Sequence, residues 1–460
     1  MGNPNLTASP ARHGDPRLGV ALAGSGLYQR KMVRVLHRLV SRRSVVLGAG
    51  AVLAAPCLAS AQPDGFRVLR ARTGTAQLRG PDRGTTAIRG FEGAVPGPAL
   101  RVKRGEELKV RLVNELVTNT AIHWHGVRVP NAMDGVVGLT QAAAVGPGES
   151  FEYRFTPPDA GTFWYHAAPR PIEDRALYGL LIVDEPEPID VDRDVALIFD
   201  AWALGADGSV DRDGVTSFTA NGRSAFDIPV VANERVRLRL VNAARNEFMT
   251  VRLDRHAATV MATDGQPAEP FPARDGRLAL APGNRVDLFI NMTLPPGTAA
   301  PIFVGSDGRE VPLARFVYST APPLRSAPKG VPKALPANPL PERMNFAAAI
   351  KLEIALDDPR HRPAPGTFGR PLFTTVPRPT VQIGFKNPTD RAHVVHLHGH
   401  SARLLDALDD GWKPFWLDTI LVPPQRTTRI AFVADNRGKW LIESQVLGGE
   451  SGIRAWFEIT

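Results

Sequence analysis

Histidines are concentrated in three short segments of this chain. Residues 123–126 read His-Trp-His-Gly, residues 161–166 read Gly-Thr-Phe-Trp-Tyr-His, and residues 393–400 read His-Val-Val-His-Leu-His-Gly-His. These segments hold seven of the nine histidines that follow residue 61. Neutral imidazole is the commonest metal ligand among protein side chains, so this concentration points to a metal site.

The spacing within two of these segments allows pairs of imidazoles to converge. In an extended strand, side chains at positions i and i+2 lie on the same face. His123 and His125 form one such pair, His396 and His398 form another, and a glycine follows each pair. One pair alone is weak support, whereas two pairs in similar contexts favour a shared metal site. The alternative is a metal-free core in which the same histidines bond to one another.

A matching segment of ligands is missing near the C-terminus. Residues 440–445 read Trp-Leu-Ile-Glu-Ser-Gln. The single cysteine, Cys57, lies in an apolar run near the N-terminus. If that run is removed as a signal sequence, the remaining chain offers neither a thiolate nor a disulfide. A metal site must then be built from nitrogen and oxygen donors.

Strands that alternate apolar and polar residues must hold these histidines in place. Three similar strand-like segments occur, at residues 106–114, 234–242 and 381–387. Each is followed by a second repeated segment, at residues 147–155, 282–290 and 424–432. The period-two alternation predicts half-buried strands. Three copies of this plan predict an all-β fold of three consecutive β-sandwich domains.

The repeats also suggest where the domains begin and end. We expect the three domains at residues 66–187, 188–320 and 345–460. The proline-rich residues 321–344 are expected to form an extended linker between the second and third domains. Apart from one turn near residues 174–177, no helix is expected.

The first 61 residues differ from the rest in charge and composition. Residues 41–47 read Ser-Arg-Arg-Ser-Val-Val-Leu, an apolar run continues to Leu58, and Ala-Ser-Ala ends at Ala61. Residues 1–61 are therefore expected to be an N-terminal extension and a twin-arginine signal peptide, cleaved after Ala61. An ordinary export signal or an uncleaved anchor are the alternatives. The expected location is the periplasm or the exterior of the cell.

Charge and hydropathy limit the partners that the remaining chain can have. Residues 1–61 carry +7 of the total net charge of +9. The rest therefore lacks the basic stripe that nucleic-acid binding needs. It also lacks an apolar run long enough to span a membrane. The expected partner is an unidentified small molecule or periplasmic protein.

With these motifs established, the chain resembles the laccase-type multicopper oxidases over nearly all of residues 66–460. Further matching segments are Met-Asp-Gly-Val at 133–136, Asp-Gly-Gln-Pro at 264–267 and Trp-Leu-Asp-Thr at 416–419. The resemblance implies three consecutive cupredoxin-like Greek-key β-sandwich domains. It also implies copper bound between the first and third of them.

The resemblance assigns copper ligands to five histidines. His123 and His396 match the two ligands of the type 2 copper. His125 and His166 match two ligands of one type 3 copper, and His398 matches one ligand of the other. His393 matches the histidine of the blue, type 1 copper.

Several positions depart from the family pattern. Ala168 stands where a second histidine of its motif is expected, and Glu443, Ser444 and Gln445 stand where His-Cys-His is expected. The ligands expected after that triplet are also absent, at Gly449 and at Ile453 or Arg454. A serine hydroxyl stays protonated and cannot replace the thiolate of a blue copper site. We therefore expect no type 1 copper, no laccase activity, and one or two type 2-like copper ions at most.

Two other functions remain open. One is a metal-free periplasmic scaffold or binding protein, similar to the copper-free cell-division members of the same superfamily. The other is a mononuclear metal enzyme that uses His123, His396 and a neighbour. A carboxylate from Glu443 beside His398 would give mixed donors that also suit zinc, iron or manganese.

Three further histidines are not expected to be ligands. His256 and His361 match no motif, so we expect both to lie in solvated loops. His400 fits the family pattern but is not a metal ligand in that family. We therefore expect it to contact a ligand residue without binding the metal itself.

Overall fold

Strands dominate the computed structural model, which describes residues 64–460 except 170, 172–173, 212, 307, 365, 406–411 and 450. The expected extension and signal peptide at residues 1–61 lie outside the described residues. Helix within the described part is limited to short 3-10 turns: η1 (Pro81–Arg83), η2 (Asn131–Met133), η4 (Arg274–Gly276) and η5 (Pro359–His361). No helix in this part of the chain has the length and apolar character needed to cross a membrane. The expected all-β fold is confirmed.

The first sandwich contains two four-stranded sheets, ordered β2-β1-β4-β6 and β3-β8-β7-β5. Its strands are β1 (Arg67–Ala76), β2 (Thr86–Phe91), β3 (Leu100–Lys103), β4 (Leu108–Asn114), β5 (Ile122–His125), β6 (Ser150–Phe155), β7 (Gly161–Ala167) and β8 (Tyr178–Asp184). Strand β4 pairs in parallel with β1 and antiparallel with β6. Strand β5 lies at one edge of its sheet, paired only with β7.

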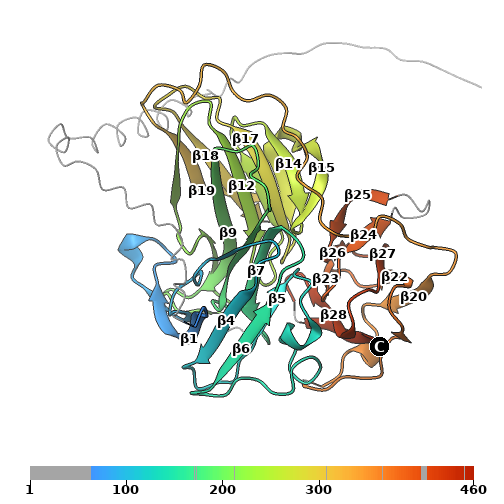
Figure 1. The fold of residues 1–460 in the computed structure, drawn as a ribbon. Helices are drawn as coiled ribbons and strands as arrows, with labels where there is room; N and C mark the ends of the chain where they lie inside the picture. The colour runs from blue at the N-terminus through green and yellow to red at the C-terminus, as the bar shows by residue number, and fades with distance from the viewer. Residues whose placement is uncertain are drawn as a thin grey trace, which may run out of the picture. The chain divides into compact units, whose positions relative to one another are not determined.

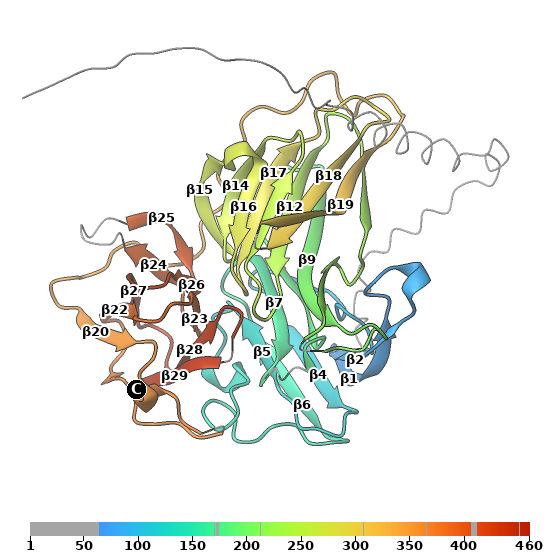
Figure 2. The same ribbon diagram turned by 180° about the vertical axis from the view of Figure 1, so that it is seen from behind.

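The second sandwich contains a six-stranded sheet, β10-β9-β12-β17-β14-β15, and a five-stranded sheet, β11-β19-β18-β13-β16. Figure 2 brings β16, β18 and β19 of the second sheet into view. The strands are β9 (Arg193–Leu204), β10 (Val215–Ala220), β11 (Phe226–Val230), β12 (Arg235–Asn242), β13 (Met249–Leu253), β14 (Ala258–Thr263), β15 (Gln266–Pro272), β16 (Arg277–Leu280), β17 (Arg285–Asn291), β18 (Ala299–Ser306) and β19 (Arg309–Tyr318).

The third sandwich contains two five-stranded sheets, β20-β22-β27-β24-β25 and β21-β29-β28-β23-β26. Its strands are β20 (Ile350–Ala355), β21 (Thr374–Thr375), β22 (Thr380–Asn387), β23 (His393–Leu397), β24 (Ala402–Leu405), β25 (Trp412–Leu417), β26 (Thr419–Val422), β27 (Arg426–Val433), β28 (Gly438–Val446) and β29 (Ser451–Ile459). Figure 1 shows β5 and β7 of the first sandwich beside β23 and β28 of the third.

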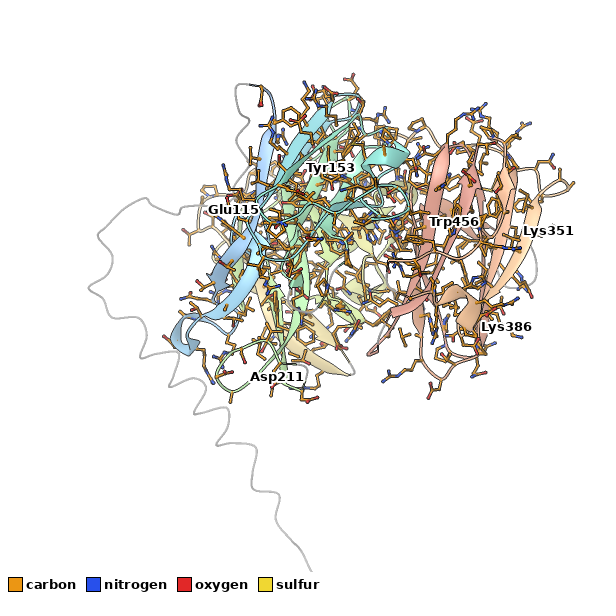
Figure 3. The ribbon with its side chains drawn as sticks, turned by 90° about the horizontal axis from the view of Figure 1, so that it is seen from below. Glu115, Tyr153, Asp211, Lys351, Lys386 and Trp456 are labelled. Atoms are coloured by element: carbon orange, nitrogen blue, oxygen red, sulfur yellow. The ribbon has the colours of Figure 1, made fainter. Side chains whose placement is uncertain are left out.

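The predicted alternation holds where one face of a strand is open to solvent. In β4, every second residue from Leu108 to Asn114 is buried. Figure 3 shows Tyr153 on β6 within the first sandwich, and Lys351 and Lys386 at the outer edge of the third. Both lysines are exposed, as expected for polar positions of half-buried strands.

Strand β12 departs from this prediction, because all eight of its residues are buried. Two of its arginines meet polar groups of the first sandwich as well as carboxylates of the second. Arg237 donates to Glu185 and Asp287, and Arg239 donates to Thr162 and to a carboxylate of β9. A neighbouring domain thus covers the face that the sequence alone assigns to solvent, and carboxylates compensate the buried charges.

The segment predicted as a linker carries no strand between residues 321 and 344. It runs against the first two sandwiches and is held by polar contacts. The side chain of Asn338 accepts from the main-chain N–H of Ala160 and donates to Gln266. Arg325 forms an ion pair with Asp192 at 2.6 Å. These contacts hold the segment as a strap on the surface of the sandwiches.

Candidate metal centre

The five predicted ligand histidines come together between the first and third sandwiches. His123 and His125 share a face of β5, as their spacing predicts, and are 2% and 6% exposed. His166 on β7 is the cross-strand partner of His123. His396 on β23 and His398 just beyond it approach from the third sandwich, with ring centroids 5.2 Å and 4.0 Å from that of His123.

Glycine is required after the first histidine pair. Gly126 has a φ of 82°, a conformation that residues with a Cβ rarely adopt. A Cβ at this position would lie 2.1 Å from the guanidinium of Arg285 and 2.5 Å from the carboxylate of Asp418. The turn after His125 can therefore approach the buried ion pair between Arg285 and Asp418 only because residue 126 has no side chain.

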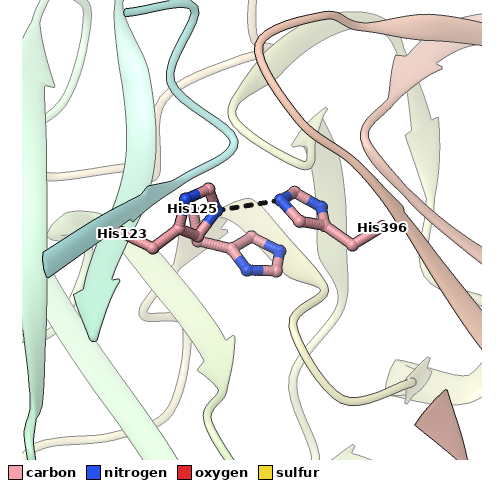
Figure 4. A group of neighbouring side chains, drawn as sticks. All are labelled: His123, His125 and His396. Carbon is pink, nitrogen blue, oxygen red and sulfur yellow. Dashed lines mark hydrogen bonds between the residues drawn. The ribbon is translucent and has the colours of Figure 1, made fainter. Parts of the chain in front are cut away.

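One pair of nitrogens converges across the domain boundary. The Nε2 atoms of His123 and His396 lie 3.1 Å apart (Figure 4). The Nδ1 atoms of these rings lie 3.0 Å from the main-chain oxygens of Asp134 and Asp418. Since a carbonyl oxygen only accepts, each neutral ring carries its proton on Nδ1 and directs the lone pair of Nε2 at the other ring.

His125 and His166, both in the first sandwich, form a second pair of neighbouring ring nitrogens. His125 Nδ1 and His166 Nε2 are 3.4 Å apart. His166 Nδ1 donates to the main-chain oxygen of Ala167 at 2.9 Å, which leaves its Nε2 unprotonated in the neutral ring. The hydroxyl of Thr419 donates to Asp418 at 2.7 Å, so it accepts from His125 Nε2 at 2.8 Å. The Nδ1 of His125 is therefore unprotonated and faces His166.

Burial favours the neutral form of two of these rings, His125 and His396. It lowers the pKa of His396 to about 4, and it lowers the pKa of His125 well below its ordinary value. Neutral imidazole is the form that binds a metal ion, so the site is prepared for binding at neutral pH.

His398 lies in a different electrostatic environment. Its Nδ1 is 3.1 Å from the carboxylate of Asp134, and its Nε2 is 3.6 Å from the carboxylate of Glu443. Burial lowers the pKa of His398, but the charges on Asp134 and Glu443 more than offset this and raise it to about 9. The pKa of Asp134 is held well below its usual range by His398 and His123, against the effect of its own burial.

Sequence reasoning missed the residues that orient these rings. Asp134 accepts from His123 and His398, whereas Asp418 and Thr419 act on His125 and His396. All three occur in segments that carry the family resemblance, Met-Asp-Gly-Val and Trp-Leu-Asp-Thr. Their proximity to histidines far away in sequence is set only by the fold.

The donor set fits copper. Two nitrogens 3.1 Å apart can both lie about 2.0 Å from one ion, the distance typical of a metal–imidazole bond. Clusters of imidazoles suit copper(II), and the bonds from Nδ1 to carbonyl and carboxylate oxygens are the usual support for histidine ligands.

Comparison with known proteins identifies the family of the chain. Three family models, each described as multicopper oxidase, match residues 74–188, 201–300 and 341–451. Multicopper oxidase MmcO of Mycobacterium tuberculosis is 30% identical over 415 residues, which cover 76% of this chain and 79% of that protein. The chain belongs to the multicopper oxidase family.

Solved structures agree with this assignment. Lac15 from a marine microbial metagenome is 33% identical, covers 85% of this chain and 99% of its own, and superposes with a TM-score of 0.76. A multi-copper oxidase from Pseudomonas Thermotolerans is 30% identical, covers 86% and 99% of the two chains, and gives the same TM-score of 0.76. The cupredoxin-like sandwich fold expected from the resemblance is confirmed.

Three of the positions that depart from the family pattern, residues 443–445, lie on β28. Ser444 is buried, and its Oγ accepts from the main-chain N–H of Ile453 at 3.0 Å and lies 3.4 Å from His393 Nδ1. Gln445 donates to Asn246 of the second sandwich at 2.8 Å. Glu443 is the cross-strand partner of His396. Residues 443 and 445 therefore alternate with 444 between two faces, as the strand requires.

The remaining histidines lie outside the cluster. His256 is not in a solvated loop as expected, because it is 4% exposed and its Nε2 lies 2.7 Å from the hydroxyl of Tyr318. The pattern around residue 256 gave no sign that the second sandwich would cover it. His361 lies in η5 and is partly exposed. His400 is buried and its Nδ1 lies 3.2 Å from the main-chain oxygen of His398.

Proposed function

We propose that this chain is an exported, copper-binding member of the multicopper oxidase family that does not work as a laccase. It holds one or two type 2-like copper ions where β5 and β7 meet β23, and it has no type 1 copper. The twin-arginine sequence near residue 42 is proposed to direct it to the periplasm. The observation that carries the proposal is the convergence of His123 Nε2 and His396 Nε2 at 3.1 Å.

This convergence favours a bound cation. With both Nδ1 atoms donating to main-chain oxygens, two lone pairs face each other in a buried place. Such an arrangement is unfavourable unless a cation lies between the nitrogens. A single proton would satisfy it only by charging one ring, and burial lowers the pKa of His396 to about 4. Copper bound by both rings satisfies both lone pairs.

The second pair supports a second ion. His125 Nδ1 and His166 Nε2 lie 3.4 Å apart, so both nitrogens can reach one ion. In family members with a complete cluster, a third imidazole is expected here, and Gln445 stands at its position. A copper ion at this pair would have fewer protein ligands than in those members. We therefore propose that it binds more weakly than copper at His123 and His396.

The position of the blue copper argues against laccase activity. A blue site needs a thiolate between the oxidisable substrate and the cluster, and Ser444 provides a hydroxyl that stays protonated. That hydroxyl is already engaged by the N–H of Ile453. Gly452 lies so close that a Cβ there would be 2.1 Å from Ser444 Oγ. The surroundings of Ser444, next to His393, are thus close-packed around a serine hydroxyl.

The chain's own residues perform three tasks in this proposal. The histidines bind, Asp134 and the Asp418–Thr419 pair hold the rings in the binding tautomer, and burial excludes water from the nitrogens. When bound, copper would supply a Lewis-acidic ion with open positions for a small oxygen or nitrogen ligand. The natural ligand or partner is proposed to be a small molecule or a periplasmic protein.

Metal analysis of the mature protein tests this proposal. After expression with copper, we expect one to two copper ions per chain, no blue absorption band and no rapid oxidation of phenolic dyes. The double variant His123→Ala/His396→Ala should lose the tighter ion, whereas His361→Ala, a change at a partly exposed histidine, should bind as the parent does. Absence of copper from the parent protein would instead favour the metal-free scaffold.

A further inference from the structure

A hollow lies between the first sandwich and the strap. It has a volume of about 490 Å³ and is lined by residues 104–105, 156–158 and 337–339. We propose that this hollow binds a small organic carboxylate with an apolar or aromatic body. The hollow shares no residue with the histidine cluster, so the inference does not depend on bound copper.

Arg104 is the only charged side chain that lines the hollow. Its Nη1 donates to the main-chain oxygen of Ala337 at 3.2 Å and to Oδ1 of Asn338 at 3.3 Å. Arg104 forms no ion pair with a described residue, and its Nε and Nη2 donate to none of them. These two nitrogens form the edge of the guanidinium that can bind a carboxylate through two parallel hydrogen bonds. The strap thus holds the guanidinium in place and leaves that edge without a protein acceptor.

Two further donors without an acceptor lie beside Arg104. The N–H of Glu106 donates to the main-chain oxygen of Lys103 at 3.0 Å, and Gly105 has a φ of 90°, which together indicate a type II turn. The N–H of Gly105 takes no part in that hydrogen bond and has no acceptor among the described residues. A Cβ at Gly105 would meet nothing within 4 Å, so the main chain is open to a ligand here. The exposed hydroxyl of Thr156 is also without a described partner.

Proline residues form rigid apolar walls around these donors. Pro157 and Pro158 follow β6, and Pro339 belongs to the strap. A proline ring fixes φ, so this surface changes little on binding. The neighbouring Asn338 is held by hydrogen bonds to the main chain of Ala160 at 2.9 Å and 2.8 Å. The hollow is therefore preformed, and its volume lies in the range of about 300–1,000 Å³ that is usual for small-molecule sites.

The composition of the lining selects the class of ligand. One guanidinium compensates one negative charge, and no carboxylate lines the hollow to attract a cation. The unpaired groups named above are all hydrogen-bond donors, which an ionised carboxylate satisfies because it only accepts. The proline walls favour an apolar body. Inorganic phosphate and sulfate lack such a body, so an organic monocarboxylate fits the hollow better.

Binding of trans-cinnamate tests this inference, with trans-cinnamamide as the uncharged probe of the same shape. Full-length mature protein is titrated by isothermal calorimetry, once with copper bound and once after chelation. We expect cinnamate to bind at one site per chain. Cinnamamide should bind at least about tenfold more weakly, because the amide lacks the charge that Arg104 compensates. The affinity for cinnamate should be the same in both preparations, since the hollow shares no residue with the copper site.

Variants of Arg104 separate this site from other surfaces of the molecule. Arg104→Gln removes the charge and should weaken cinnamate binding at least about tenfold. Arg104→Lys keeps the charge but loses the parallel pair of donors, so its affinity should lie between those of the parent and Arg104→Gln. The matched control is Arg309→Gln, at an exposed arginine of β19 that also lacks a described ion pair, and it should bind as the parent does.

Two further measurements check the fold and locate the ligand. The thermal unfolding midpoint of Arg104→Gln should stay close to that of the parent, because Asn338 still holds the strap to Ala160. In nitrogen-15 spectra of the parent, cinnamate should shift the amide resonance of Gly105, whose N–H has no acceptor in the free protein.

The outcomes decide this inference separately from the proposed function. Cinnamate binding that is weakened in Arg104→Gln and retained in Arg309→Gln supports it, with or without copper. Equal binding of cinnamate and cinnamamide, equal binding by the parent and Arg104→Gln, or no binding at millimolar cinnamate overturns it. An unchanged Gly105 resonance at saturation also overturns it, since the ligand would then lie elsewhere. None of these results affects copper at His123 and His396.

Discussion

In the candidate ligand histidines, the hydrogen bond of one ring nitrogen fixes which nitrogen of the neutral ring is unprotonated. His123 and His396 donate from Nδ1 to main-chain oxygens and present Nε2. His125 does the opposite, because its Nε2 donates to Thr419. A hydroxyl outside the cluster thus decides which atom of His125 faces His166.

This role of Thr419 predicts the effect of removing its hydroxyl. In Thr419→Val, His125 Nε2 loses its acceptor, so Nδ1 is no longer fixed as the unprotonated nitrogen. We expect copper at His125 and His166 to bind about 10- to 100-fold more weakly, with copper at His123 and His396 retained. Copper stoichiometry measured by equilibrium dialysis should fall by up to one ion per chain. Thr419→Ser keeps the acceptor and should restore it; equal loss in both variants would contradict this role.

The charged environment of His398 predicts how the stability of the metal-free protein depends on pH. Asp134 and Glu443 raise the pKa of His398 to about 9, above its value of about 6.5 in the unfolded chain. A raised pKa stabilises the folded state below pH 6.5 and loses this contribution as the pH rises toward 9. The full effect amounts to about 3 kcal/mol. We therefore expect the free energy of unfolding to fall between pH 6.5 and 9.

Chemical denaturation in the presence of a chelator measures this dependence. His398→Gln should flatten the alkaline decrease, while His361→Gln should leave it unchanged. His396 acts in the opposite direction, since burial lowers its pKa to about 4 and its neutral form is favoured on folding. Its contribution is lost as the pH falls from 6.5 toward 4. An unfolding free energy that is constant from pH 6.5 to 9 in the parent protein would refute the charge assignment for His398.

At the scale of elements, the sequence predicted what depends on a single strand. The i, i+2 spacing placed His123 and His125 on one face of β5. Burial of β12 was missed because Arg237 and Arg239 look solvent-facing until carboxylates of other elements meet them. His256 was missed for the same reason.

The candidate site, like the fold, was predictable only for features that are local in the sequence. Residue type and spacing identify the histidines, because ligand chemistry is local to each motif. The partners that fix their tautomers depend on contacts between distant elements. Asp134 comes from the loop after β5, and Asp418 comes from the connection between β25 and β26. Sequence spacing carries no information about how these loops meet the rings.

At the scale of the whole molecule, one buried ion pair joins the three sandwiches beneath the cluster. Arg285 on β17 of the second sandwich donates to Asp418 of the third at 2.8 Å and 2.5 Å. It also donates to the main-chain oxygen of Thr162 on β7 of the first sandwich at 3.3 Å. Arg285 and Asp418 are completely buried. The second sandwich therefore contributes no ligand but holds the aspartate that accepts from Thr419.

Removing the arginine should affect both stability and metal binding. Arg285→Met leaves Asp418 as an uncompensated buried charge, so we expect a loss of about 3–5 kcal/mol in the free energy of unfolding. The matched control is Arg315→Met, which breaks an ion pair whose side chains are 58% and 53% exposed and should cost no more than about 1 kcal/mol. Copper affinity should fall in Arg285→Met and stay unchanged in Arg315→Met. Of the two aspartates that lose their arginine, Asp418 contacts Thr419 and the histidine cluster, whereas Asp227 does not. Equal losses of stability in the two variants, together with an unchanged copper affinity in Arg285→Met, would show that the second sandwich does not support the copper site through this pair.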